Sequence, residues 1–350
     1  CENNEPVKTI TRIDRILIIA PSWLGDATMS HSLIKNLSER FKPVTIDVFA
    51  AAALRAVFER MPEIGQIIAN PLEHGELKLA TRWQIGQSLR STNYDAAYVL
   101  PNSFKSALIP FFARIPKRIG YTGEARVGLL NQRVVLNKTS FPLLADQYLQ
   151  LAKKENTSCI KSSEYPHLSA EKNEVRRALR KYGLNNTKAY VCLCPGAEYG
   201  AAKRWPIKHF AELADQISRC DLHPVILGNS KDTEIGRAID KYSKYSTTDL
   251  TSKTSLKEAI HIISGARCVV TNDSGLMHIA AALKTPLIAL FGSSSPQYTP
   301  PLSINSKIIS LTMSCSPCFE RTCPLGHTKC LTEIEPRAVM KEVLKLTERI

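Results

Sequence analysis

Residues 191–206 read Val-Cys-Leu-Cys-Pro-Gly-Ala-Glu-Tyr-Gly-Ala-Ala-Lys-Arg-Trp-Pro, and the rest of the chain is best understood from this stretch. The apolar run Tyr190–Cys194 predicts a buried strand, which ends at Pro195. Lys203 and Arg204 follow, just before a helical pattern. Two adjacent cations after a strand suit a phosphate-rich ligand, because lysine supplies a point charge and arginine a planar fork of donors. For a single such pair, however, a solvated basic turn is the commoner outcome.

Length and charge limit the classes of protein to consider. The chain has 350 residues, which favours two domains over one core. Its 46 Lys and Arg outnumber 32 Asp and Glu, and the net charge of +14 indicates polyanionic partners: nucleic acid, an anionic membrane face or phosphorylated substrates. No basic tail, zinc-finger spacing or aromatic RNA-binding signature supports nucleic acid. No apolar run approaches the roughly 18 residues that span a bilayer.

Short apolar runs alternate with helical patterns from Arg15–Ala20 to Pro286–Phe291. This alternation predicts an α/β fold of parallel sheets with helices on both faces. The polar span Glu155–Leu168 predicts the connection between two such units, whose facing strand ends would form a ligand cleft. We therefore expect a leader at 1–13, a first Rossmann-like domain at 14–165, a second at 166–334, and a helix at 335–350 that could pack back on the first domain.

The loop after the first predicted strand contains Trp23-Leu-Gly25-Asp26. Gly25 permits close backbone approach to a ligand, and Asp26 places a carboxylate at the mouth of the cleft. A carboxylate there could take the proton from an acceptor hydroxyl. Alternatively, Asp26 only caps a helix that begins at Ala27, and the sequence leaves both interpretations open.

A second motif, Val270-Thr-Asn-Asp-Ser-Gly-Leu-Met-His278, joins a strand end to a helix start at Gly275. The first N–H groups of such a helix and its positive dipole end can bind a diphosphate. Asp273 and Ser274 could bond sugar hydroxyls or simply cap the helix. His278 falls on the first turn, where a histidine among Ala, Leu and Met more often faces a core than a ligand.

The remaining motifs are weaker or absent. Lys105, Arg118 and Arg126 could hold anionic groups of an acceptor, although solvated surface charge is the commoner role for any one of them. No DxD-type acidic pair offers itself to a divalent metal on the diphosphate, so Lys203 and Arg204 would do that electrostatic work with the helix end. No Walker A, GxGxxG or nucleophile-elbow sequence occurs.

Four stretches together resemble the lipopolysaccharide heptosyltransferase II family: Pro21–Asp26, Leu100–Phe112, Cys194–Pro206 and Asn272–Leu283. The likeness runs from about residue 14 to about residue 300. It implies a GT-B fold, in which two Rossmann-like domains face a central cleft. It also implies inverting transfer of L-glycero-D-manno-heptose from ADP-heptose onto the first heptose of the lipopolysaccharide inner core, without a cofactor or dissociable metal in catalysis.

The resemblance implies roles for individual residues. Asp26 resembles the general base, and Asn102, Ser103, Lys105, Arg118 and Arg126 would contact the phosphorylated acceptor. The implied donor site consists of Lys203, Arg204, Glu234, Asp273, Ser274, Gly275, Leu276 and Met277. Within that set, Lys203 resembles the diphosphate-binding lysine and Asp273 the aspartate on the heptose hydroxyls. Glu234 is similar in position to the glutamate on the adenosine ribose, with Asp232 as a near neighbour.

The resemblance also implies partners and a location. The partners are ADP-heptose, a heptosyl-Kdo-lipid A acceptor and the surface of the inner membrane, at whose cytoplasmic face the enzyme would lie peripherally. Three alternatives stay open: a related heptosyltransferase acting at another core position, a sugar-nucleotide-binding module without turnover, and a nucleic-acid-binding protein. Asp26 beside a complete donor site argues against the module.

Four cysteines lie outside the resemblance: Cys315, Cys318, Cys323 and Cys330, with His327 between the last two. The C-x2-C spacing begins many structural zinc sites, so we expect a structural zinc ion as one possibility. Free or pairwise-oxidised thiols are the alternative.

Overall fold

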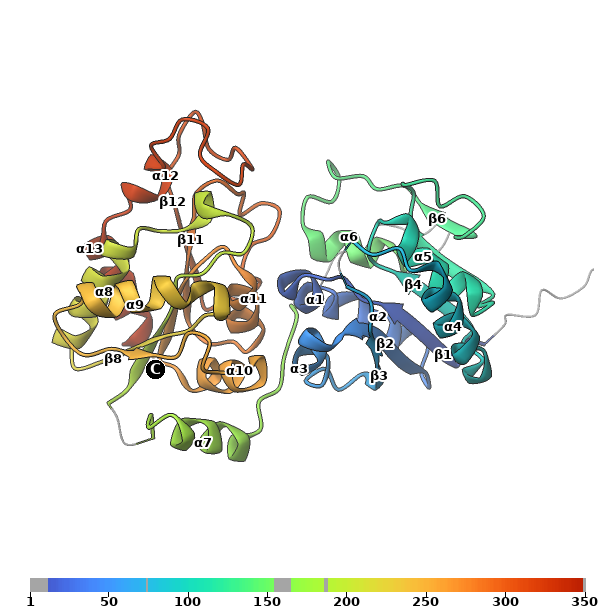
Figure 1. The fold of residues 1–350 in the computed structure, drawn as a ribbon, viewed down its shortest axis with the longest axis horizontal. Helices are drawn as coiled ribbons and strands as arrows, with labels where there is room; N and C mark the ends of the chain where they lie inside the picture. Colours follow the sequence, from blue (N-terminus) through green and yellow to red (C-terminus); the bar gives the residue numbers. More distant parts are fainter. Residues whose placement is uncertain (1–11, 74, 154–164, 186–187, 349–350) are drawn as a thin grey trace, which may run out of the picture.

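The computed structural model describes residues 12–73, 75–153, 165–185 and 188–348. It contains two domains side by side, each built on a six-stranded parallel sheet (Figure 1). The sheet orders are β3-β2-β1-β4-β5-β6 and β12-β11-β10-β7-β8-β9. Counted from the first strand of its own domain, each sheet has the order 3-2-1-4-5-6, which is that of doubly wound dinucleotide-binding folds.

The first domain follows the predicted alternation. Its strands are β1 (Arg15–Ile19), β2 (Thr45–Ala51), β3 (Ile64–Asn70), β4 (Ala96–Val99), β5 (Lys117–Tyr121) and β6 (Gln132–Val134). Its helices are α1 (Leu24–Met29), α2 (His31–Arg40), α3 (Arg55–Phe58), α4 (Leu79–Leu89), α5 (Phe104–Phe112) and α6 (Leu144–Gln150). After the exposed Arg15, β1 is apolar because both faces are covered: Ile16 and Ile18 face one buried cluster, and Leu17 and Ile19 face another.

The second domain repeats the plan. Its strands are β7 (Tyr190–Cys194), β8 (His223–Ile226), β9 (Thr248–Asp249), β10 (Cys268–Asn272), β11 (Leu287–Phe291) and β12 (Ser306–Ser310). Its helices are α7 (Lys172–Lys181), α8 (Ile207–Arg219), α9 (Thr233–Tyr242), α10 (Leu256–Gly265), α11 (Gly275–Ala282), α12 (Lys329–Thr332) and α13 (Pro336–Thr347). Short 3-10 turns include η3 (Ala201–Lys203) and η4 (Ser230–Asp232). The edge strands β9 and β12 were not predicted, since they lack a continuous apolar run.

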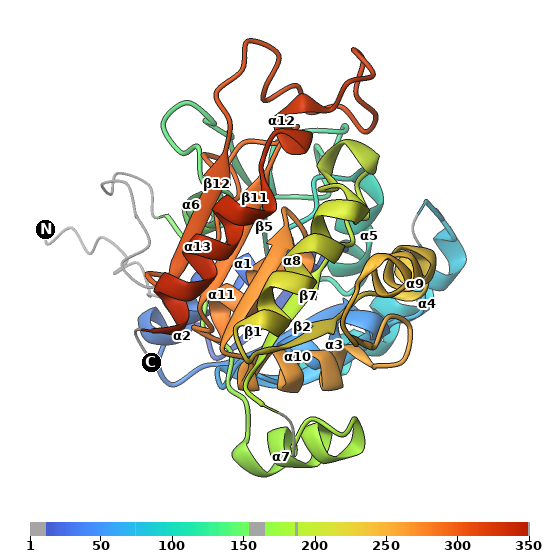
Figure 2. The same ribbon diagram turned by 90° about the vertical axis from the view of Figure 1, so that its left-hand side faces the viewer.

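The last helix differs from expectation. We predicted that the helix at 335–350 could return to the first domain, but α13 packs on α8, β10 and β11 of the second (Figure 2). Its apolar face, which includes Val339, Met340 and Val343, is buried in that domain's core. The turn before it is fixed by the indole N–H of Trp205, which donates to the carbonyl oxygen of Ile334 at 2.9 Å. Amphipathicity therefore predicted a buried face but not its partner.

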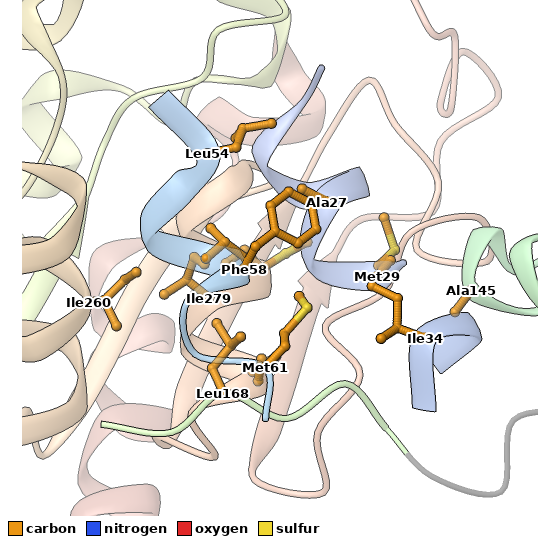
Figure 3. Close-up of a cluster of buried hydrophobic side chains, with 14 of the residues drawn as sticks. Ala27, Met29, Ile34, Leu54, Phe58, Met61, Ala145, Leu168, Ile260 and Ile279 are labelled. Carbon is orange, nitrogen blue, oxygen red and sulfur yellow. The ribbon is translucent and has the colours of Figure 1, made fainter. Parts of the chain in front are cut away.

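The two domains share an apolar interface. One buried cluster includes Phe58 and Met61 from the first domain together with Ile260 and Ile279 from the second (Figure 3). Across it, a guanidinium nitrogen of Arg60 lies 2.7 Å from Nε2 of His261. The predicted leader lies mostly outside the described residues, as does the chain at 154–164, next to the predicted boundary at residue 165. That boundary stays a prediction.

Helices α1 and α11 cross closely at this interface, and a glycine on each makes the crossing possible. A Cβ atom added at Gly25 would lie 2.6 Å from the ring of His278, and one at Gly275 would lie 2.7 Å from Leu24. We expected Gly25 to allow a ligand close to the backbone. In the structure, His278 of the second domain occupies the space next to Gly25.

Candidate active site

A cavity of about 530 Å³ lies where the carboxyl ends of the strands of both domains meet. From the first domain it is lined by Trp23, Leu24, Gly25 and Asp26. From the second it is lined by loops that follow β7, β8, β10 and β11. This is the position at which doubly wound folds bind their ligands.

Asp26 provides the carboxylate of the first domain. It lies in the first turn of α1, which begins at Leu24 rather than at the expected Ala27, and no side chain caps this helix. Within the described residues, the Asp26 carboxylate has no hydrogen-bond partner. Burial raises the pKa of Asp26 to about 6, an effect that the positive charge of Lys203 partly offsets. A carboxylate with a raised pKa is a stronger base, and it can still be ionised at neutral pH.

Lys203 and Asp273 face Asp26 from the second domain as an ion pair, with Nζ 2.5 Å from Oδ2. Ser294 donates a second hydrogen bond of 2.5 Å to the same Asp273 oxygen. Asn272 fixes the loop that carries Lys203: its side chain accepts from the N–H of Trp205 at 3.0 Å and donates to the carbonyl oxygen of Pro195 at 2.7 Å. The basic loop is therefore held against the end of β10.

The amino end of α11 completes this side of the cavity. Ser274, Gly275 and Leu276 line the cavity, and Ser274 makes no side-chain cap, so the first N–H groups of α11 are left for a ligand. Met277 is fully buried and belongs to the domain interface cluster. Three of the four predicted helix-end residues thus reach the cavity.

Asp232 and Glu234 differ in position. The Asp232 carboxylate lines the cavity, accepts from the N–H of Asn229 at 3.0 Å and lies against Gly196, where an added Cβ would be 2.4 Å away. Burial raises the pKa of Asp232. The Glu234 side chain is 85% exposed, pairs with Arg237 at 3.0 Å and does not line the cavity. The structure therefore brings the near neighbour, rather than Glu234, to the site.

Comparisons with known proteins agree with this arrangement. Residues 82–329 match the sequence model of glycosyltransferase family 9 (heptosyltransferase). The chain is 41% identical to lipopolysaccharide heptosyltransferase 2 of Escherichia coli strain K12, over 94% of this chain and 97% of the relative. It is 43% identical to lipooligosaccharide heptosyltransferase 2 of Haemophilus influenzae, over 85% and 88%. The solved structure of the E. coli ADP-heptose LPS heptosyltransferase II superposes with a TM-score of 0.87 at 39% identity, covering 96% and 99%.

This chain belongs to glycosyltransferase family 9. It is an enzyme of the heptosyltransferase type, and the expected GT-B fold is confirmed. The cavity lies between its two Rossmann-like domains, where the sequence motifs predicted a ligand cleft.

Of the five residues expected at the acceptor, none lines the cavity. Arg126 is 1% exposed and donates to the carbonyl oxygens of Pro101 and Tyr121. Arg118 donates to backbone carbonyls at 2.6 and 2.7 Å. Both guanidinium groups are therefore engaged within the first domain, where they tie its loops together.

Asn102, Ser103 and Lys105 have a different setting. They follow β4, which pairs with β1 so that Val99 lies opposite Ile19. Because the two strands are parallel, the loop after β4 lies at the same edge of the sheet as the loop that leads to Asp26. These three residues lie at that edge of the sheet and do not line the cavity.

Several residues of the site were not predicted from the sequence. Tyr199 lines the cavity, and its ring centroid is 4.9 Å from Nζ of Lys203. Ser294 and Tyr298 line it from the chain after β11. The position of these residues after a buried strand is the signal that could have found them. His278 is buried, as expected of a core histidine, yet it also lines the cavity; burial lowers its pKa to about 4.

The four cysteines outside the resemblance come together. Cys315, Cys318, Cys323 and Cys330 line one small cavity with His327, and all four are free thiols. Backbone N–H groups of the following turn lower the pKa of Cys323. Within the described residues, no three or more His, Cys, Asp or Glu side chains form a group that could hold a metal ion.

Proposed function

We propose that this enzyme transfers L-glycero-D-manno-heptose from ADP-heptose onto the first heptose of the lipopolysaccharide inner core, with Asp26 as the general base. One observation carries the proposal. A carboxylate without a hydrogen-bond partner, with its pKa raised to about 6, faces a lysine–aspartate pair and a free helix end across one cavity. The names of the similar E. coli proteins, which include ADP-heptose and LPS, support the same substrates.

In this mechanism Asp26 takes the proton of the acceptor hydroxyl as its oxygen attacks the anomeric carbon of heptose. The bond from that carbon to the diphosphate breaks with inversion, and its electron pair leaves with ADP. Lys203 and the amino end of α11 stabilise the charge that develops on the leaving group. When the donor binds, its diphosphate becomes a second partner of Lys203, and Asp273, still held beside it by Ser294, accepts from heptose hydroxyls.

The other donor contacts follow from position. Ser274, Gly275 and Leu276 present the helix end to the diphosphate, with Met277 as their buried support. Arg204 is half-buried, donates to the carbonyl oxygen of Ala197 at 3.3 Å and does not line the cavity, so we assign it an indirect role through its positive charge near Asp232. We assign the adenosine ribose to Asp232, because it is the carboxylate that lines the cavity at the end of β8, and Glu234 is the alternative.

For the acceptor, we propose that Asn102, Ser103 and Lys105 contact its phosphorylated groups. All three lie at the edge of the first sheet that carries Asp26. Arg118 and Arg126 would act indirectly, because their guanidinium groups already hold neighbouring backbone carbonyls.

We further propose that the enzyme works peripherally at the cytoplasmic face of the inner membrane. No helix in the described part of the chain is long and apolar enough to cross a bilayer. The α4–α5 face nevertheless exposes five large apolar side chains: Leu77, Leu79, Trp83, Phe104 and Phe111. Arg82 links α4 to α5 at this face, because it donates to the carbonyl oxygens of Leu77 at 2.6 Å and Lys105 at 3.0 Å.

Charge favours an anionic lipid surface as the partner of this face. Residues 77–118 contain seven Lys and Arg and a single acidic residue, Asp95. Two further carboxylates touch this face, since Glu76 pairs with Lys78 and Glu124 accepts from the N–H of Phe104, each at 2.7 Å. Seven basic side chains therefore stand against three acidic ones. The Asp95 carboxylate is occupied by the N–H groups of Asp14 and Arg15 at the opposite end of β4. Exposed apolar side chains within a basic surface are typical of interfacial binding.

Vesicle sedimentation tests the membrane proposal. We expect Leu79→Ser/Trp83→Ser to reduce binding to anionic vesicles by about thirtyfold or more, at about 1–2 kcal/mol for each of the two side chains. Tyr242→Ser, at an aromatic side chain equally exposed on the second domain, should have no effect. Equal binding of all three chains would contradict the assignment of this face.

A structural zinc ion at Cys315, Cys318, Cys323 and Cys330 is the last part of the proposal. The shared cavity and the lowered pKa of Cys323 support it, since zinc binds thiolates. The four thiols would have to move closer around the ion. Metal analysis of the purified chain, with Cys315→Ser/Cys318→Ser as its control, should find about one zinc per chain that the variant lacks. Absence of zinc from both would favour free or paired thiols.

ADP release in the presence of ADP-heptose and truncated cores tests the central proposal. Transfer onto a core with a single heptose, and not onto one without heptose, is the expected result. Transfer onto the heptose-free core would instead make this a first-heptose enzyme. ADP-heptose binding without transfer to either core would favour a sugar-nucleotide-binding module.

A further inference from the structure

Two loops of the second domain pack directly on each other: the Lys203 loop, residues 195–204, and the cysteine loop, residues 313–330. Ala202 donates its N–H to the carbonyl oxygen of Arg321 at 3.0 Å, and the Tyr199 hydroxyl donates to that of Phe319 at 2.6 Å. A Cβ atom added at Gly200 would lie 2.3 Å from the Arg321 oxygen. The two backbones therefore touch with no room for a side chain between them.

The contact continues into the donor site through Tyr199. Its ring centroid lies 4.9 Å from Nζ of Lys203 and 5.3 Å from the guanidinium carbon of Arg321. Phe319, in the same loop as Arg321, lines the central cavity together with Tyr199 and Lys203. Arg321 does not line that cavity. The cysteine loop thus reaches Lys203 through one aromatic ring.

The cysteine loop also holds the chain that carries the second partner of Asp273. Ser293 accepts from the N–H of Phe319 at 2.7 Å, and Gly292 accepts from the Ser316 hydroxyl at 2.7 Å. The next residue, Ser294, donates to Asp273. Both groups that bind the Asp273 carboxylate, Lys203 and Ser294, therefore belong to segments in contact with the cysteine loop.

The four thiols lie next to both segments that the cysteine loop supports. The small cavity that the four cysteines line is also lined by Ala202 and Ser293, one from each of the segments that the loop supports. A change in the shape of the thiol cluster would therefore act directly on the backbone next to Lys203.

From these contacts we infer that the cysteine loop is a positioning element for the donor site, with its thiol cluster setting where Lys203 and Asp273 lie. The inference rests on the proposed binding of ADP-heptose in the central cavity. Loosening the loop should weaken donor binding, because Lys203 and Asp273 would lose their fixed separation. Acceptor binding, which we place on the first domain, should not change.

Three variants of the full chain test this: Arg321→Ala, Gly200→Ala and Cys315→Ser/Cys318→Ser. We measure the ADP dissociation constant by calorimetry, and KM for donor and acceptor separately. Arg321→Ala removes a cation from beside Tyr199 and should raise the ADP dissociation constant and donor KM about threefold. Gly200→Ala forces the two backbones apart and should raise both about tenfold or more. The double cysteine variant should fall between them. Acceptor KM should stay within about twofold of the wild type in all three.

Arg337→Ala is the matched control, because Arg337 is an exposed arginine on α13 that does not line the cavity. Circular dichroism melting checks each fold, and Arg321→Ala keeps the test valid if Gly200→Ala does not fold. If donor KM and ADP affinity keep their wild-type values in Arg321→Ala and in the cysteine variant, the inference is overturned and the proposed donor site is not affected. A wild-type chain that binds no ADP would overturn the proposed donor site, and the inference with it.

Discussion

The two walls of the central cavity hold their charged groups differently. On the second-domain wall, Asp273 is paired with Lys203 and bonded by Ser294, and Asn272 fixes the loop behind them. On the first-domain wall, Asp26 has no such partner, and burial raises its pKa to about 6. Hydrogen bonds hold the side chains of the paired wall in one arrangement, which suits a single ligand geometry. A buried carboxylate without such bonds has a raised proton affinity, which suits it to take a proton. In the proposed mechanism, this difference separates donor binding on one wall from proton removal on the other.

The most severe test of this difference is Asp26→Asn. The amide keeps the shape of the side chain but cannot accept the acceptor proton, so kcat should fall between about a hundredfold and ten-thousandfold. The ADP dissociation constant should stay close to that of the wild type, because the donor wall is unchanged. Steady-state kinetics and calorimetry on the same preparation give both values. Loss of ADP binding in this variant would mean that the two walls do not act separately.

Lys203→Ala tests the opposite wall. The substitution removes the cation expected on the diphosphate and leaves Asp273 as a buried carboxylate without its partner. Donor KM and kcat should both worsen, with kcat/KM lower by about one hundredfold. Lys345→Ala, at an exposed lysine of α13 paired with Glu342, is the control and should change little. Normal donor KM in Lys203→Ala would remove the lysine from the donor site.

The pH dependence of the reaction distinguishes the walls by a smaller effect. Asp26 must be ionised to act as a base, so kcat/KM should fall tenfold per pH unit below about pH 6.

The effect of Asp26 on the free energy of unfolding has the opposite sign to that of an ion-paired carboxylate. Burial raises the pKa of folded Asp26 from 3.8 to about 6, so its cost to folding is absent below 3.8 and complete above about 6. Asp26→Asn should therefore melt at a higher temperature than the wild type at pH 8, and at nearly the same temperature at pH 3.5.

The two walls were also predictable from the sequence to different degrees. Asp26, Lys203 and Asp273 each follow a buried parallel strand, and the ends of such strands meet at one edge whatever the details of packing. Their convergence could therefore be predicted from the alternation of apolar runs and helical patterns. Their pairing could not, because the hydrogen bond from Ser294 depends on how the turn after β11 folds.

The predictions that differ from the structure share one physical origin. Arg126 looked like a surface cation, yet its guanidinium is buried on backbone carbonyls that only the folded loops bring together. The amphipathic pattern of α13 required a buried face without specifying which sheet would cover it. Contacts between distant segments decided each case, and a local pattern contains no information about them.

The smallest expected effect concerns which carboxylate binds the ribose. Asp232 and Glu234 are two residues apart near the start of α9, and a two-residue difference turns a helical side chain to another face. We expect Asp232→Asn to raise the ADP dissociation constant about fivefold, or about 1 kcal/mol, because the amide oxygen can still accept a hydrogen bond but without the charge that strengthens it. Glu234→Gln should leave the ADP dissociation constant within about twofold of the wild type, because that side chain is exposed and pairs with Arg237.

Calorimetry with ADP and with ADP lacking the ribose hydroxyls separates a ribose contact from a change in the η4 turn. An effect of Asp232→Asn that persists without those hydroxyls would mean that Asp232 only supports the turn over Gly196, and a larger effect of Glu234→Gln would return the role to Glu234.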